Sequence, residues 1–163
     1  MGHFMAKNKN ASNMRELNYK LDLETLAVNF LSRRPLGLTK EDRLNGFTFF
    51  QTTGLLNDSA LALADCEARK YQAQMSPWSP NKLTKPNFDV TGNWFQMIWA
   101  KSSRIGCASQ QYLENRKTRT VLVCKYDVPM EIGKEIYKVG QPCSGCEKMK
   151  TRCDYLKMLC ILG

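Results

Sequence analysis

The stretch that decides the fold is GNWFQMIWAKSSRIGCA, residues 92–108. Its first half is apolar on all sides, which predicts a short buried helix over residues 93–101 rather than a surface helix. The pattern then changes, because residues 104–112 and 119–128 have the composition of two strands, and the polar residues 114–117 suit the turn between them. The stretch therefore predicts a helix followed directly by a sheet.

The second of these strands contains the run VLVC, residues 121–124, which is apolar on both faces. Such a run predicts a central strand that is covered on both sides. Upstream, an amphipathic helix is predicted from a cap at Asp22 to about Arg34, because Leu23, Leu26, Ala27, Phe30 and Leu31 recur at helical spacing. A second helix is predicted over residues 58–71, and residues 75–88, which hold three prolines, are predicted to form a loop. Helices, then strands, then a cysteine-rich end indicate an α+β layered domain.

The composition favours one globular domain with a small appendage. The chain has 163 residues, of which 43% are hydrophobic and 24% are charged. No apolar run reaches the roughly 18 residues that a membrane span needs. The first ten residues, MGHFMAKNKN, have no apolar core and so do not suit a signal peptide. If the protein is secreted, we expect this sequence to be a mature or a truncated form.

The net charge of +9 suits an acidic partner, such as nucleic acid, an acidic polysaccharide or an anionic lipid. Simple solubility is the other interpretation. The basic residues fall in several short runs, and none of the runs dominates: 7–9, 33–34, 116–119 and 148–152. Charge alone therefore names no partner.

Seven cysteines in a short chain indicate an oxidising compartment, and two glycosylation sequons at Asn10 and Asn57 agree with it. Cys107 and Cys124 lie on adjacent predicted strands, where a disulfide would stabilise the fold by roughly 3 kcal/mol; two buried thiols are the alternative. Cys66 is then left as a buried free thiol. The remaining four, Cys143, Cys146, Cys153 and Cys160, suit either two disulfides or a zinc site of four thiolates.

The stretch 92–108 resembles the GH[YF]TQ[MIL]VW…GC signature of the CAP superfamily, which comprises cysteine-rich secretory proteins, insect venom antigens, plant pathogenesis-related proteins and nematode venom-allergen-like proteins. VLVCKYDVP and EIGKEIYKVGQPCSGC, residues 121–129 and 131–146, are similar to the second signature and the start of the family's hinge. ASNMRELNYKLDLETLA, residues 11–27, is most similar to nematode members. The resemblance implies an α-β-α sandwich with a three-stranded antiparallel sheet over residues 1–139 and a cysteine-rich hinge-like tail over residues 140–163. The helix that usually precedes ASNM is expected to be truncated.

The resemblance also implies site residues. The hinge pattern would pair Cys143 with Cys153 and Cys146 with Cys160. Many members carry a cavity tetrad of two histidines and two glutamates, but this chain has Asn93 at one histidine position. Glu67, followed by Tyr71, is the one tetrad carboxylate that the chain retains. We therefore expect Glu67, Asn93 and Gln96 to mark a residual cavity that binds no divalent metal and no other cofactor.

Enzymatic activity is not expected, because the single histidine, His3, lies in a terminus that we expect to be frayed, which leaves no ordered histidine as a partner for a serine or cysteine nucleophile. The aromatic residues Trp78, Trp94, Phe95, Trp99 and Tyr112 suit core packing, or, by resemblance, an apolar groove for a sterol or fatty acid. The sequence predicts a secreted CAP-type interaction protein that binds an extracellular protein, an acidic glycan or a lipid, possesses no membrane span and binds no nucleic acid. The alternative is a basic zinc-ribbon-like protein that binds nucleic acid through its C-terminal cysteines.

Overall fold

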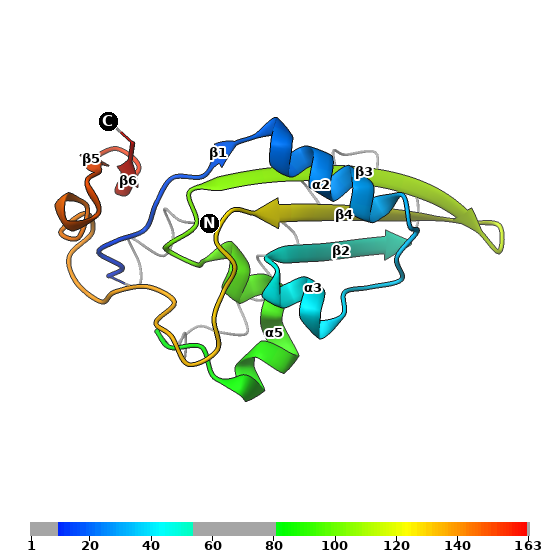
Figure 1. The fold of residues 1–163 in the computed structure, drawn as a ribbon, viewed down its shortest axis with the longest axis horizontal. Helices are drawn as coiled ribbons and strands as arrows, with labels where there is room; N and C mark the ends of the chain where they lie inside the picture. The colour runs from blue at the N-terminus through cyan, green and yellow to red at the C-terminus, as the bar shows by residue number, and fades with distance from the viewer. Residues whose placement is uncertain (1–9, 54–80, 163) are drawn as a thin grey trace.

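The computed structural model describes residues 10–53 and 81–162. Their elements follow one another along the chain as shown in Figure 1. They are β1 (Asn18–Tyr19), α2 (Leu21–Leu31), α3 (Lys40–Leu44), β2 (Phe47–Thr53), α5 (Lys85–Met97), β3 (Arg104–Glu114), β4 (Lys117–Tyr126), a 3-10 turn (Glu147–Met149), β5 (Arg152–Asp154) and β6 (Leu159–Ile161).

The main sheet has the strand order β1-β3-β4-β2. β4 pairs antiparallel with both β3 and β2, so these three form the antiparallel sheet that the resemblance implies. β1 adds a fourth, parallel strand of two residues. The prediction that residues 121–124 form a central strand is confirmed, because Val121, Leu122 and Val123 are at most 2% exposed.

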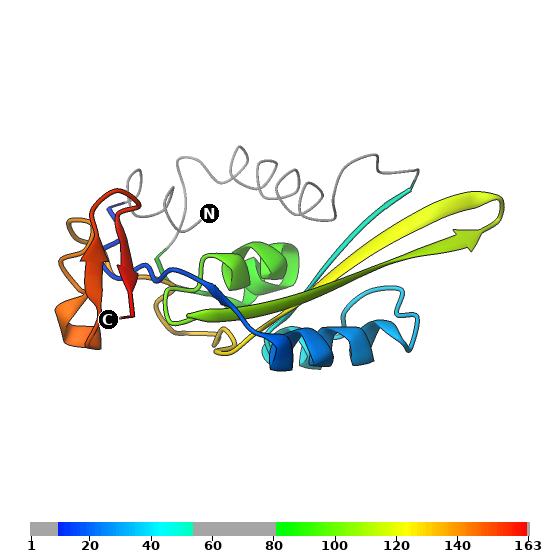
Figure 2. The same ribbon diagram turned by 90° about the horizontal axis from the view of Figure 1, so that it is seen from above.

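Helices cover both faces of this sheet, which confirms the α+β sandwich. Figure 2 shows α2 on one face and α5 on the other, and α3 lies beside β2 (Figure 1). On the α2 face, Ala27, Phe30 and Leu31 pack against side chains of all three antiparallel strands, namely Phe49, Tyr112, Val121 and Val123. A Cβ atom at Gly106 would lie 2.1 Å from the backbone nitrogen of Glu24, so the close approach of α2 to β3 requires glycine there.

Two of the predicted boundaries are wrong. The helix expected over residues 93–101 is α5, which begins eight residues earlier at Lys85 and ends at Met97. Pro86 lies in its first turn, where proline is tolerated because the N–H it lacks would have no acceptor within the helix. α2 begins one residue before Asp22 and ends at Leu31, with Lys20 as its N-cap. The predicted helix over residues 58–71 and most of the proline-containing loop lie outside the described residues.

The tail is joined to an early segment of the chain by backbone hydrogen bonds. The Cys160 N–H donates to the Met14 carbonyl at 2.8 Å, and the Glu16 N–H donates to the Cys160 carbonyl at 3.0 Å. The Gly145 N–H donates to the Ser12 carbonyl, also at 3.0 Å. β5 and β6 form their own two-stranded sheet within the tail. The division of the chain at residue 140 stays a prediction.

Candidate functional site

Asn93, at the position where the resemblance expects a cavity histidine, uses its side-chain amide on a neighbouring strand. Its Oδ1 accepts a hydrogen bond from the Phe49 N–H at 3.2 Å, and its Nδ2 donates to the Phe49 carbonyl at 2.7 Å. Phe49 lies on β2, an edge strand of the described sheet. Asn93 therefore supplies both hydrogen bonds that a further strand would give to Phe49.

Gln96 is fully buried one turn further along α5. Its Oε1 accepts from the Met130 N–H at 2.9 Å, and its Nε2 donates to the Val128 carbonyl at 3.0 Å. The Ser102 hydroxyl donates to the same carbonyl at 2.8 Å. Gln96 thus fixes the loop that follows β4 against α5.

The two amides serve different segments, since Asn93 contacts β2 and Gln96 contacts the loop after β4. Glu67, the third expected cavity residue, and Cys66, the expected free thiol, lie outside the described residues. A residual cavity lined by Glu67, Asn93 and Gln96 therefore stays a prediction. Within residues 10–53 and 81–162, no group of three or more histidine, cysteine, aspartate or glutamate side chains could hold a metal ion.

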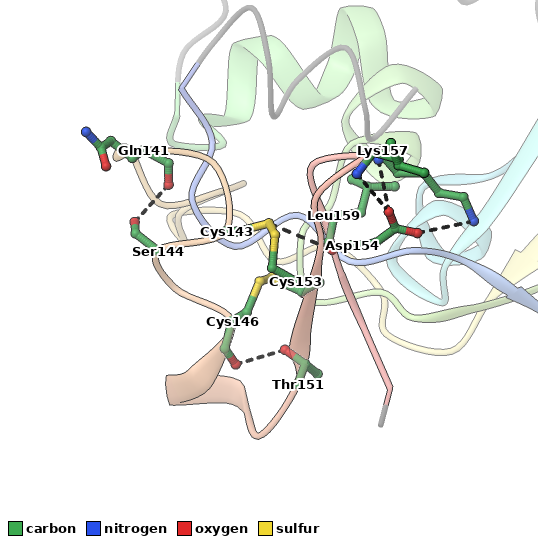
Figure 3. The surroundings of a disulfide bond; sticks show 11 residues. Gln141, Cys143, Ser144, Cys146, Thr151, Cys153, Asp154, Lys157 and Leu159 are labelled. Atoms are coloured by element: carbon green, nitrogen blue, oxygen red, sulfur yellow. Dashed lines mark hydrogen bonds and ion pairs between the residues drawn. A yellow bond between two sulfur atoms is a disulfide. The ribbon is translucent and has the colours of Figure 1, made fainter.

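Six cysteines form disulfides in the described part of the chain. Cys107 and Cys124 lie directly opposite each other on β3 and β4, with their Cα atoms 4.1 Å apart. In the tail, Cys143 is bonded to Cys153 (Figure 3). Cys146 is bonded to Cys160. With these four sulfur atoms bonded to one another, the tail has no thiolate ligand for zinc, so the zinc-ribbon alternative is not supported.

Two hollows lie at opposite ends of the molecule. One, of about 600 Å³, lies in the tail beside the disulfides and is lined by residues of 141–155, including Arg152 and Tyr155. The other, of about 270 Å³, lies beside the turn between β3 and β4 and is lined by Thr53, Glu114, Asn115, Lys117 and Arg119. Figure 1 shows the tail and this turn at the two ends of the long axis.

Tyr112 contacts several segments at the end of the molecule that contains the turn between β3 and β4. Its hydroxyl donates to the Leu31 carbonyl at the end of α2, at 3.0 Å. Arg119, directly opposite Tyr112 on β4, places its guanidinium carbon 4.9 Å from the centre of the Tyr112 ring. The guanidinium carbon of Arg34 lies 5.8 Å from the same centre. Sequence reasoning missed this cluster, because Arg34 and Arg119 are far apart in the chain.

Asp127 holds the start of β3. Its partial burial alone would raise the pKa of its carboxyl, but four hydrogen bonds to that carboxylate outweigh burial and lower the pKa below its ordinary value. The donors are the N–H groups of Ser103 and Arg104, the Ser103 hydroxyl and the Arg104 guanidinium, at 3.0 to 3.3 Å. The charged form of Asp127 therefore ties the loop before β3 to the end of β4.

Comparison with known proteins identifies the family of this chain. Residues 9–126 match the family model described as CAP, the cysteine-rich secretory protein family. The chain belongs to the CAP family. The CAP assignment agrees with the fold, because the crystal structure of the hookworm platelet inhibitor matches 98% of this chain and 83% of its own chain with a TM-score of 0.76 at 23% identity.

Two curated proteins illustrate the CAP relationship. Peptidase inhibitor 16 of Homo sapiens is 29% identical over 143 residues, which are 83% of this chain and 29% of that protein. The cysteine-rich venom protein of Tityus serrulatus is 26% identical over 152 residues, which are 91% of this chain and 38% of that protein. The chain thus spans well under half the length of these CAP relatives. No helix within the described residues is long and apolar enough to cross a membrane.

Proposed function

We propose that this CAP protein is secreted and acts by binding an extracellular protein, an acidic glycan or a lipid, without catalytic turnover. The observation that carries the proposal is the hydrogen bonding of the Asn93 and Gln96 side chains. Both side-chain amides are occupied by hydrogen bonds to backbone groups, and neither can take or give a proton at neutral pH. These two residues, which the resemblance assigns to a polar cavity, instead join α5 to β2 and to the loop after β4.

Secretion is supported by the three disulfides, since such bonds persist in oxidising compartments. A relative named as a venom protein supports it further. The finer part of the proposal is modulation of a host, and its support is the similarity of residues 11–27 to nematode members of the family.

The experiment is a screen of the oxidised protein against arrays of extracellular proteins, acidic glycans and lipids. We expect saturable binding to one of these classes. Glu67→Gln should leave that binding intact, because the proposal places recognition on the surface rather than at the tetrad position. Failure to bind any class at micromolar protein, with the disulfides intact, would contradict the proposal.

A further inference from the structure

The fold brings together two basic runs that are about 80 residues apart in sequence. Arg33 and Arg34 follow the end of α2, whereas residues 116–119 belong to the hairpin of β3 and β4. Two hydrogen bonds join the two segments: the Tyr112 hydroxyl donates to the Leu31 carbonyl, and Nη1 of Arg119 donates to the Pro35 carbonyl at 3.2 Å. The result is a single basic surface at one end of the sheet, which we call the Tyr112 surface. Its exposed cations are Arg33, Arg34, Arg116 and Lys117, and the buried Arg119, which is 8% exposed, joins the two segments.

Aromatic rings hold three of these guanidinium groups. Arg34 and Arg119 both lie over Tyr112, and the guanidinium carbon of Arg33 lies 5.0 Å from the centre of the Phe30 ring. Stacking of this kind is favourable for arginine and restricts its long side chain. A ligand that binds these groups therefore loses less side-chain entropy than it would on freely rotating cations.

The charge of the Tyr112 surface is poorly compensated. Glu114 accepts a hydrogen bond from Nη2 of Arg119 at 3.1 Å. Among the described residues, Arg33, Arg34, Arg116 and Lys117 form no ion pair, and all four are exposed. The acidic residues of α2, Asp22 and Glu24, lie in its first turn, at the opposite end of that helix. Four exposed cations thus remain available to an anionic partner.

The arrangement of these cations suits a linear polyanion. Arg33 and Arg34 are adjacent after the end of α2, and Arg116 and Lys117 are adjacent at the turn of the hairpin, so the exposed cations form two pairs rather than a single point charge. The hollow of about 270 Å³ beside Lys117 and Arg119 adds the hydroxyl of Thr53 and the amide of Asn115, which suit sugar hydroxyl groups. Guanidinium groups match the paired oxygens of sulfate and carboxylate groups.

We propose that the Tyr112 surface binds a sulfated polysaccharide. This inference rests on the proposed binding function and names the partner class and the face that recognises it. Attraction by exposed charges is weakened by salt, so the interaction is expected to fall steeply as the ionic strength rises.

The test measures the affinity of the oxidised protein for heparin, a sulfated polysaccharide, by calorimetry at physiological ionic strength. A surface variant carries Arg33→Gln, Arg34→Gln and Arg116→Gln. A control variant carries Lys148→Gln, Lys150→Gln and Arg152→Gln, which are exposed residues of the tail. Both variants lose three positive charges, from the Tyr112 surface in one and from the tail in the other. We expect Kd to rise about tenfold or more in the surface variant and less than about threefold in the control, since each exposed ionic contact contributes up to about 1 kcal/mol.

A second variant, Arg116→Gln with Lys117→Gln, removes two cations that stack on no described ring and so tests the surface without disturbing Tyr112. Its Kd should rise about threefold or more. Equal losses in the surface and control variants would show attraction to net charge alone and would overturn the inference. So would the absence of heparin binding, or binding to vesicles rich in phosphatidylserine in place of heparin. None of these results contradicts the proposed function, which fails instead if the protein shows turnover or binds no partner.

Discussion

The side chain of Asn93 forms hydrogen bonds with both backbone groups of Phe49, and so an amide on α5 supplies the two contacts that a neighbouring strand would give to this residue of β2. A histidine at this position could not reproduce the pair, because its two ring nitrogens point in different directions, whereas the oxygen and nitrogen of the asparagine amide lie side by side. The pairing joins α5 to β2 at this position.

Asn93→Ala is therefore expected to lower the free energy of unfolding by about 1–3 kcal/mol, because it removes the partner of two partly buried backbone groups. Urea denaturation of the oxidised protein measures the change. Asn29→Ala on the exposed side of α2 is the control and should cost less than about 0.5 kcal/mol. Equal effects of the two substitutions would show that the Asn93 pairing contributes nothing.

Gln96→Leu is expected to cost more, about 2–4 kcal/mol. The leucine fills a similar volume but leaves the Met130 N–H without its acceptor in a fully buried position. The Val128 carbonyl would keep the Ser102 hydroxyl as a donor. The loss of stability would therefore come mainly from the unpaired N–H of Met130. Hydrogen exchange of the Met130 amide reports this directly, and unchanged protection in the variant would contradict the role given to Gln96.

Some of this architecture could be predicted from sequence and some could not. The apolar run that begins at Val121 predicts a central strand, because a strand that is buried on both faces does not alternate between apolar and polar residues. The start of α5 was missed because Pro86 is typical of loops, although the first turn of a helix tolerates it equally well. β2 was missed as well, since its Phe47, Phe49 and Phe50 lie in a segment with no recognisable family motif.

The Tyr112 surface shows a different limit of sequence reasoning. Arg34 and Arg119 meet only because α2 crosses β3 closely at Gly106 and because the register sets Arg119 opposite Tyr112. Neither condition can be derived from the charge of a single segment. A sequence gives the number of cations, whereas their concentration on one face depends on long-range packing.

The disulfide pairs give a prediction that does not depend on function. We expect the denatured, unreduced protein to contain about one free thiol, at Cys66, and peptide mapping to recover the pairs 107–124, 143–153 and 146–160. A peptide that contains Cys66 bridged to any of these six cysteines would contradict the pairing.

Acid should destabilise the protein partly through Asp127. Its pKa is lowered in the folded state, so its contribution to stability is fully present above its unfolded pKa, near 4, and is lost as the pH falls through the folded value. Asp127→Asn should therefore reduce stability at pH 7 and flatten its decline below about pH 4. Urea denaturation at a series of pH values measures both effects. If the stability of the variant declines below about pH 4 as steeply as that of the wild-type protein, another carboxyl group is responsible for the decline.

The proposal that this CAP protein binds without catalytic turnover is tested by an assay of the oxidised wild-type protein against esterase and protease substrates. We expect rates equal to those of a buffer control, both for the wild-type protein and for Glu67→Gln. Turnover by the wild-type protein that Glu67→Gln abolishes, while circular dichroism and the disulfide map stay unchanged, would show that the protein is an enzyme.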